Sequence, residues 1–203
     1  MSEKKWTHAA WMAIGAAALT PPNLLLAVLT DLSVADGWVA VPVAVIALVV
    51  GTAAAVLSLI ALYRFRELLN ERYAYHGIDG LVTFVIVTIS ILTVVSVAGR
   101  LLMAVTAATG ENLFMTLVFV APIILLGVAT GVVSIVLGIK LFGLENDLQH
   151  LIKPYAVVSI VGGACFALVV LAPVGMLLLI AENVILALTF FRANESDPTV
   201  EFV

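Results

Sequence analysis

Two charged residues lie within long apolar runs, and they are the first candidates for chemistry. Arg100 interrupts the apolar run 81–109, and Glu182 lies in the run 155–191. Charged side chains inside a membrane are costly, and they commonly pair with one another or line a route for ions or protons. We therefore predict that Arg100 and Glu182 form an intramembrane polar pair. In this pair Arg100 either fixes helix packing, extends its side chain toward the membrane surface, or lines a polar pathway.

The rest of the chain is apolar enough to explain why these charges stand out. Of its 203 residues, 64% are hydrophobic and 11% are charged, whereas a soluble domain carries roughly 25% charged residues. Apolar runs of the ~20 residues that a membrane-spanning helix needs recur along the chain. The sequence predicts an all-α fold, a polytopic transmembrane helical bundle that forms a single domain.

Five spans are predicted, at about 6–30, 38–63, 81–109, 113–139 and 155–183. A polar connector, 64–79, joins the second span to the third, and another, 140–154, joins the fourth to the fifth. An acidic tail covers 192–203. Leucines at three- and four-residue steps in the second connector are typical of an amphipathic segment lying in the membrane interface.

The last apolar stretch allows two interpretations. As one helix, the 37 residues of 155–191 would extend about 55 Å, which is too long for a hydrocarbon core of ~30 Å. The stretch is either one kinked span or two short spans that fold back at 172–175. Pro21 and Pro22 lie too close to the end of the first span for a hairpin, and Thr20 can compensate a kink there. By analogy we interpret Pro173 as a kink, which favours five spans over the alternative of six.

Charge predicts the orientation. Seven basic residues fall on one side if the spans alternate from the first one onward: Lys4, Lys5, Arg64, Arg66, Arg72, Lys140 and Lys153. The charged residues of the opposite loops are the acidic Asp31, Asp36 and Glu111. By the positive-inside rule, the N-terminus and both connectors face the cytoplasm. We expect a multi-pass protein of the cytoplasmic membrane, with its C-terminus outside if there are five spans.

A shift of 76 residues indicates an internal repeat. It superposes Gly51 on Gly127 and Ser58 on Ser134. These residue types are scarcer here than Leu, Val and Ala, so their coincidence carries more information. The pattern predicts a parallel tandem repeat of a two-helix unit, unlike the inverted repeats of many secondary transporters.

Small residues recur at equivalent places in the two proposed units. Gly51 and Ala55 are four residues apart, as are Gly127 and Gly131. This spacing places small residues on one helix face and lets another backbone approach closely. The partner is either another span of the same chain or a second subunit.

The sequence favours a function without catalysis. It contains no catalytic, phosphate-binding or ion-filter motif, and neither His76 nor His150 belongs to an established metal-ligand pattern, so we predict no cofactor and no metal site. No basic cluster of the kind that binds nucleic acid is present. We expect an accessory subunit or self-assembling scaffold that associates with itself or with a membrane-protein partner in the lipid bilayer. The alternative is a small channel or transporter with a polar path at Arg100 and Glu182, and a lipid-modifying enzyme would need a polar cavity near 64–79.

Overall fold

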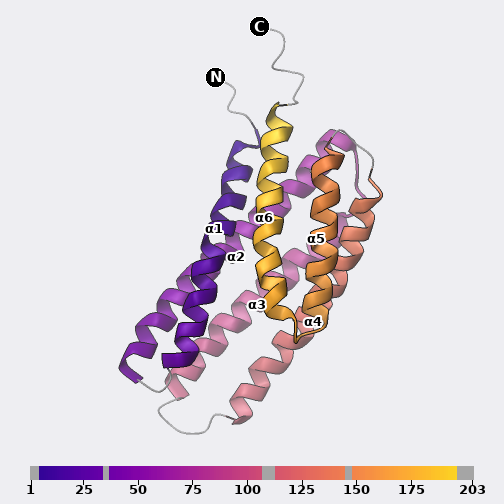
Figure 1. The fold of residues 1–203 in the computed structure, drawn as a ribbon. Coiled ribbons are helices and arrows are strands. Elements are labelled where there is room, and N and C mark those ends of the chain that lie inside the picture. Colours follow the sequence, from indigo (N-terminus) through magenta and orange to yellow (C-terminus); the bar gives the residue numbers. More distant parts are fainter. Residues whose placement is uncertain (1–4, 34–36, 107–112, 145–147, 196–203) are drawn as a thin grey trace.

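The computed structural model contains six helices, shown in Figure 1. They are α1 (Thr7–Ser33), α2 (Gly37–Tyr73), α3 (Asp79–Thr106), α4 (Leu113–Phe142), α5 (Gln149–Ala167) and α6 (Ala172–Glu195). The structure describes residues 5–33, 37–106, 113–144 and 148–195, without the side chains of 30–33, 37–41, 100–106, 113–120 and 149. All six helices are long and apolar enough to cross a membrane. An apolar chain forms helices in lipid because each helix satisfies its own backbone hydrogen bonds. The predicted helical bundle is confirmed, and it fits a multi-pass integral membrane protein.

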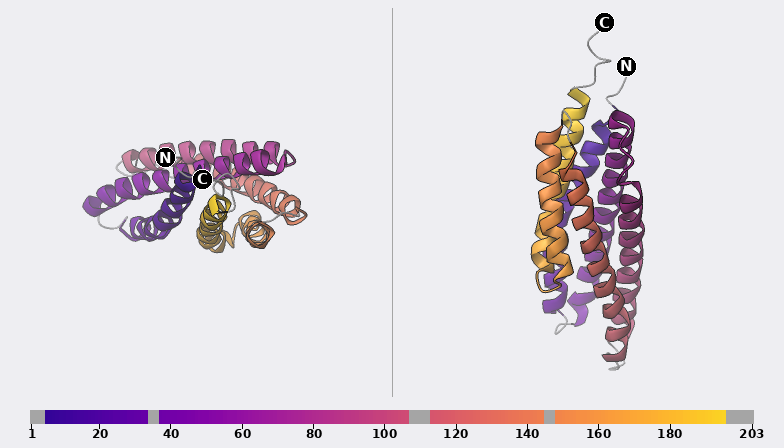
Figure 2. Two further views of the ribbon diagram at one scale, coloured as in Figure 1. Left: turned by 90° about the horizontal axis from the view of Figure 1, so that it is seen from above. Right: turned by 90° about the vertical axis from the view of Figure 1, so that its right-hand side faces the viewer.

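The six helices form a closed ring. Each helix packs against the next along the chain, and α6 returns to pack against α1. Viewed from above in Figure 2, α2 and α3 lie along one side, with α5 and α6 on the other. Large apolar side chains point away from the bundle, and Val170, Leu125 and Val94 are among the most exposed. Such exposure is expected for side chains that face lipid.

The choice of five spans is wrong, because the last apolar stretch is two helices. Residues 168–171 form the turn between α5 and α6, with Val169 at a φ of 46°. The Phe166 ring then lies against Gly175, where a Cβ would be only 3.1 Å from the ring. Pro173 is the second residue of α6 and not a kink, since proline suits the first turn of a helix, where its missing N–H has no partner to lose. Pro21 and Pro22 lie inside α1, which continues through both residues, and a kink there stays a prediction.

The predicted connectors are mostly the ends of helices. Residues 64–73 belong to α2, and Phe65, Leu68 and Leu69 are fully buried. Leu141 and Leu148, from the second connector, are buried too. These apolar side chains therefore pack into the bundle, and the predicted position of the second connector in the membrane interface stays a prediction.

The tandem repeat is not confirmed. A shift of 76 residues places α3, which is one unbroken helix, on residues 155–182. That segment contains the turn between α5 and α6. The same shift also matches residues of α2 with residues of α4, and a common origin of these two helices stays a prediction.

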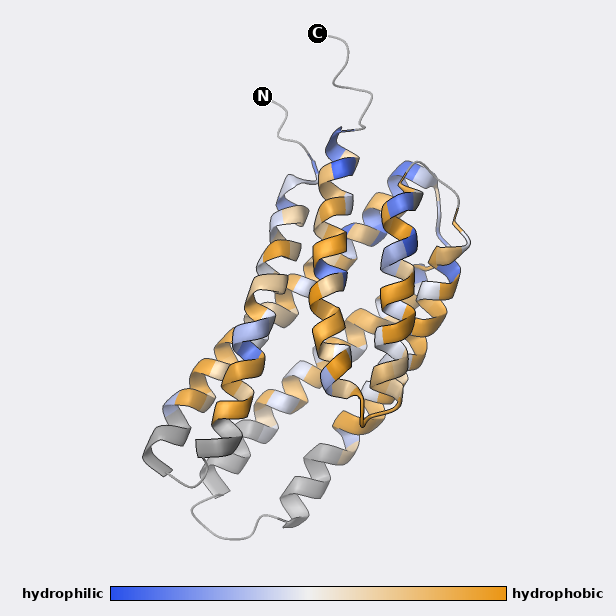
Figure 3. Ribbon diagram, in the orientation of Figure 1, coloured by the Kyte–Doolittle hydropathy of each residue, from blue (hydrophilic) through white to orange (hydrophobic). Residues whose placement is uncertain are grey.

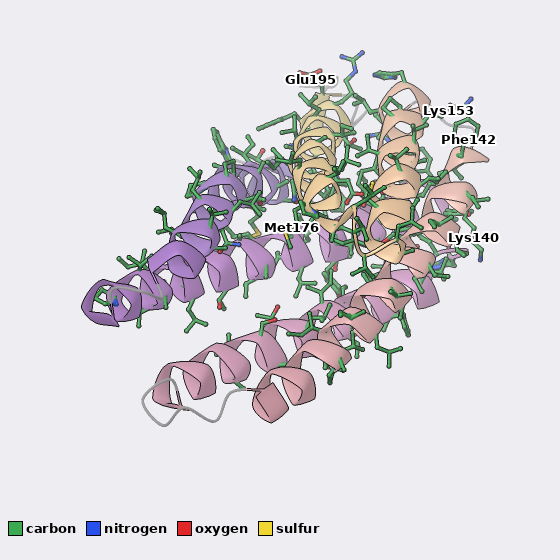
Figure 4. The ribbon with its side chains drawn as sticks, turned by 60° about the horizontal axis from the view of Figure 1, so that its bottom comes forward. Lys140, Phe142, Lys153, Met176 and Glu195 are labelled. Carbon is green, nitrogen blue, oxygen red and sulfur yellow. The ribbon has the colours of Figure 1, made fainter. Side chains whose placement is uncertain are left out.

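Charged and polar residues gather at one end of the bundle, which we call the polar end. It carries Lys5, Arg66, Arg72, Lys140, Lys153 and Arg192, the N- and C-terminal sides of the chain, and the α2–α3 and α4–α5 connections (Figure 3). In Figure 4, Lys140, Phe142, Lys153 and Glu195 mark this end, and Met176 lies near the opposite end of α6. Many of the buried side chains that the structure describes lie toward the polar end, among them Phe65, Leu68, Leu141 and Phe190.

Specific polar contacts join the helices at the polar end. The Asp79 carboxylate accepts hydrogen bonds from Arg66 Nε at 2.7 Å and Asn70 Nδ2 at 2.9 Å, which fastens the start of α3 to α2. Asn194 of α6 accepts a bond from the Trp6 backbone N–H at 3.0 Å, and the Trp6 ring stacks on Phe190. These contacts hold α1, α2, α3 and α6 in register.

The end of α2 provides a first prediction. Ala74 has a φ of 48° and its N–H donates to Asn70 O, as in the αL motif that ends many helices, and the Tyr75 N–H donates to Leu69 O. A left-handed residue with a Cβ is strained, so Ala74→Gly should raise the free energy of unfolding by about 1 kcal/mol. Reversible unfolding in mixed micelles measures this change. The control Ala98→Gly, at an exposed site inside α3, should lower the free energy of unfolding by about 1 kcal/mol. If both substitutions lowered the free energy of unfolding, Ala74 would not have the left-handed conformation.

Candidate functional site

A cavity of about 420 Å³ lies at the centre of the ring. Side chains of α2, α3, α4, α5 and α6 line it, and most are apolar. The polar members are Ser58, Ser96, Thr130, Ser134, Tyr155, Ser159, Glu182 and Asn183. The cavity therefore combines apolar walls with a few polar groups, as binding sites for small organic molecules do.

Among the described residues that line the cavity, Glu182 is the charged one. It lies ten residues beyond Ala172 on α6, or about 15 Å along the helix, close to the middle of a hydrocarbon core. Figure 3 shows a hydrophilic band that interrupts the apolar middle of α6. Its carboxylate faces α5, with Oε1 3.5 Å from the position that a Cβ on Gly162 would take. The missing side chain at Gly162 thus leaves space for the carboxylate.

Two polar side chains of α5 connect to Glu182. The Ser159 hydroxyl lies within reach of both the Glu182 carboxylate and the Tyr155 phenol. A hydroxyl has one proton, so Ser159 can donate to Glu182 while it accepts from Tyr155. Tyr155 is buried and its ring lies 5.2 Å from that of Phe65. A row of polar side chains therefore runs from the core of the polar end to Glu182.

Asn183 connects the same part of α6 to α2. Its Nδ2 donates to Ser58 Oγ at 3.2 Å and to the Leu179 carbonyl at 2.9 Å, and its side chain is buried. Successive residues of a helix point about 100° apart. Glu182 and Asn183 therefore reach toward different walls of the cavity.

The structure leaves the predicted partner of Glu182 open. Arg100 belongs to α3, but its side chain lies outside the described residues, so the pair stays a prediction. Among the side chains that are described, no lysine, arginine or histidine forms an ion pair with Glu182. Within that part of the chain, its carboxylate is held by neutral groups.

A second cavity, of about 200 Å³, lies between α1, α2 and α3. Asn23, Thr52, Thr93 and Ser96 supply its polar lining, and Ser96 also lines the central cavity. The Asn23 side chain fits against Gly51, where a Cβ would lie 2.6 Å from Asn23 Oδ1. The two cavities thus share a wall on α3.

The small residues predicted to pack helices have different surroundings. Gly51 contacts α1 through Asn23, and Gly131 lies against the α5 backbone at Gly163. Gly127 has no atom within 4 Å of a built Cβ and lines the central cavity, while Ala55 is half-buried.

Sequence reasoning identified Glu182 but missed the residues around it. Tyr155, Ser159, Gly162 and Phe166 follow one another at steps of four, three and four residues, and all line the cavity. That spacing marks one helix face, so the stripe was visible in the sequence. Its proximity to Glu182 depends on the turn between α5 and α6, which the five-span interpretation removed.

Comparison with known proteins adds no relative: no protein family, curated protein or solved structure matches this chain.

Proposed function

We propose that this protein is a small membrane transporter that binds its solute in the central cavity. The observation that carries the proposal is the cavity itself, with a carboxylate at mid-depth and walls from five of the six helices. Its volume of about 420 Å³ lies within the range of ~300–1,000 Å³ typical of small-molecule sites. The proposal adopts the transporter alternative of the sequence and involves no catalysis.

The orientation follows from charge. The polar end carries most of the basic residues, including Arg64, Arg66 and Arg72 on α2. We infer by the positive-inside rule that this end faces the cytoplasm, and with it both termini. The other end of the bundle, with the α5–α6 turn, then faces the opposite side of the membrane.

Association as a scaffold is less well supported than transport. The small-residue faces were its main support, and Gly51 and Gly131 contact helices of the same chain. An accessory or self-associating role stays a prediction. A lipid-modifying role is also weakened, because Arg66, Asn70 and His76 bind Asp79 and so hold the start of α3.

Cysteine accessibility tests transport without knowledge of the solute. Cys165 is the single cysteine, so Cys165→Ala gives a clean background. In that background we expect Gly127→Cys to react with a charged, membrane-impermeant methanethiosulfonate added to either side of oriented vesicles. The reaction needs water to form the thiolate, and a transporter opens its cavity to each side in turn.

The control is Val132→Cys on the same helix. Val132 is 50% exposed on the outside of the bundle, so lipid should keep a cysteine there unreactive. If Gly127→Cys reacts from neither side, the cavity is closed and dry, and the scaffold hypothesis gains. Reaction from one side only would contradict transport, because the site would never change the side to which it opens.

A further inference from the structure

The chemical class of the solute follows from the contrast between one carboxylate and its apolar surroundings. This inference rests on the proposed transport function. Among the described residues that line the central cavity, Glu182 is the charged one. A carboxylate without a counter-charge at this depth is costly, and the cost disappears if a proton or a bound cation neutralises it.

The walls favour an organic cation over an inorganic one. Inorganic cations need several oxygen ligands in a close cage. Here the carboxylate lies beside Ser159 and Gly162, and the Leu178 side chain also lies beside Gly162. Leu59, Leu62, Val85, Ile123, Leu137 and Leu179 are among the apolar residues that complete the walls. A large cation with apolar groups would match both the volume and the walls.

Two aromatic rings lie at opposite ends of the α5 face that lines the cavity. Tyr155 is near the polar end, and Phe166 is eleven residues further along, against Gly175. The distance along the helix is about 16 Å. Aromatic faces attract organic cations, so an occupant would meet such a ring at either end and the Glu182 carboxylate between them.

We propose that the cavity binds a lipophilic organic cation, with Glu182 as its counter-charge, and that a proton and this cation occupy Glu182 in turn. One proton leaves the carboxyl group when a monovalent cation binds, so the total charge inside the cavity is unchanged. The Ser159 hydroxyl positions one carboxylate oxygen and leaves the other for the cation. This exchange would couple solute movement to proton movement in the opposite direction.

None of the other described titratable groups near α6 competes with Glu182 as the group at which a proton and the cation exchange. Tyr155 of α5 interacts with Glu182 and is a neutral phenol. The described charged residues of α1 and α2 are at or near the polar end, and they are Lys5, His8, Arg64, Arg66, Glu67, Glu71 and Arg72. The α2 group that faces Asn183 is the Ser58 hydroxyl, which does not titrate.

Binding of tetraphenylphosphonium to the purified protein tests the proposal. Isothermal titration calorimetry should show saturable binding at about pH 8 and at least about tenfold weaker binding at about pH 5. At about pH 5, where the empty carboxyl group is protonated, buffers of different ionisation enthalpy should report release of close to one proton per cation, and at about pH 8 the release should be much smaller. Tetraphenylborate has the same shape and the opposite charge, and it should not bind. Equal binding of the two ions would overturn the proposal.

Matched variants distinguish the loss of the Glu182 charge from a general loss of folding. Glu182→Gln should weaken tetraphenylphosphonium binding at least about tenfold and remove its pH dependence, whereas Glu182→Asp, which keeps the carboxylate, should retain both. Glu195→Gln removes an equal charge from an exposed site and should change nothing. If Arg100→Leu binds the cation while the wild type does not, Arg100 is the counter-charge and the proposal fails. A cavity cysteine that reacts from both sides in a protein that binds neither ion would refute this inference and leave transport standing.

Discussion

Replacing Gly131 with alanine is expected to lower the free energy of unfolding by about 3 kcal/mol, although the change adds a single methyl group. A Cβ at Gly131 would lie 2.5 Å from the Gly163 carbonyl oxygen and 2.8 Å from the Ala167 backbone nitrogen. Both atoms belong to the α5 backbone, which cannot turn aside as a flexible side chain can. The two helices would have to separate.

Glycines on both helices allow the close approach of α4 and α5. A Cβ at Gly163 would in turn lie 2.5 Å from the Gly131 carbonyl oxygen, and one at Gly138 would lie 2.6 Å from the Ala156 carbonyl oxygen. In lipid, helices associate through van der Waals packing and not by leaving water. Separation of α4 from α5 therefore removes much of what holds this pair together.

Gly127→Ala is the matched control for Gly131→Ala. Gly127 lies one turn earlier on the same helix, and nothing lies within 4 Å of a Cβ built there. The two substitutions change helix propensity equally, so the difference between them isolates the contact. Reversible unfolding by sodium dodecyl sulfate in mixed micelles, followed by circular dichroism, measures both. Equal stability of the two variants would show that α4 and α5 are not in contact at Gly131.

Hydropathy was sufficient to predict the class of fold, but it could not locate every turn. The first four helices begin and end near charged or polar residues, which made them visible. The turn between α5 and α6 consists of Leu168, Val169, Val170 and Leu171, which are as apolar as the helices they connect. The excess length of the apolar stretch was the correct signal. The analogy between Pro173 and Pro21 outweighed it, although proline has different effects in the first turn and in the interior of a helix.

The candidate site was predicted in part for a similar reason. Glu182 was conspicuous because a carboxylate inside an apolar run needs an explanation wherever it falls. Ser159 and Asn183 are ordinary in membrane helices, and they gain importance only from their contacts with Glu182 and Ser58. Those contacts depend on which helices are neighbours in the ring. No periodicity within one helix carries that information.

Both termini are expected on the same side of the membrane, and reporter fusions in a bacterial host test this directly. Green fluorescent protein fused after Val203 should fluoresce, and alkaline phosphatase fused there should be inactive, because six spans return the chain to the cytoplasm. The Ala193 carbonyl accepts a hydrogen bond from Arg72 at 3.0 Å, which places the end of α6 beside the basic end of α2. The basic residues that set the orientation of α2 therefore set that of α6 as well.

A fusion inside the chain provides the control and separates the two topologies. Placed after Val170, in the turn between α5 and α6, the same reporters should give the inverse result, since five helices precede that point. If residues 155–183 formed a single span, the Val203 fusion would have active phosphatase and no fluorescence. The Val203 fusion would then place the C-terminus outside, and Glu182 would lie near the outer surface in contact with water. The depth of Glu182, and with it the need for a neutralising proton or cation, therefore depends on the sixth helix.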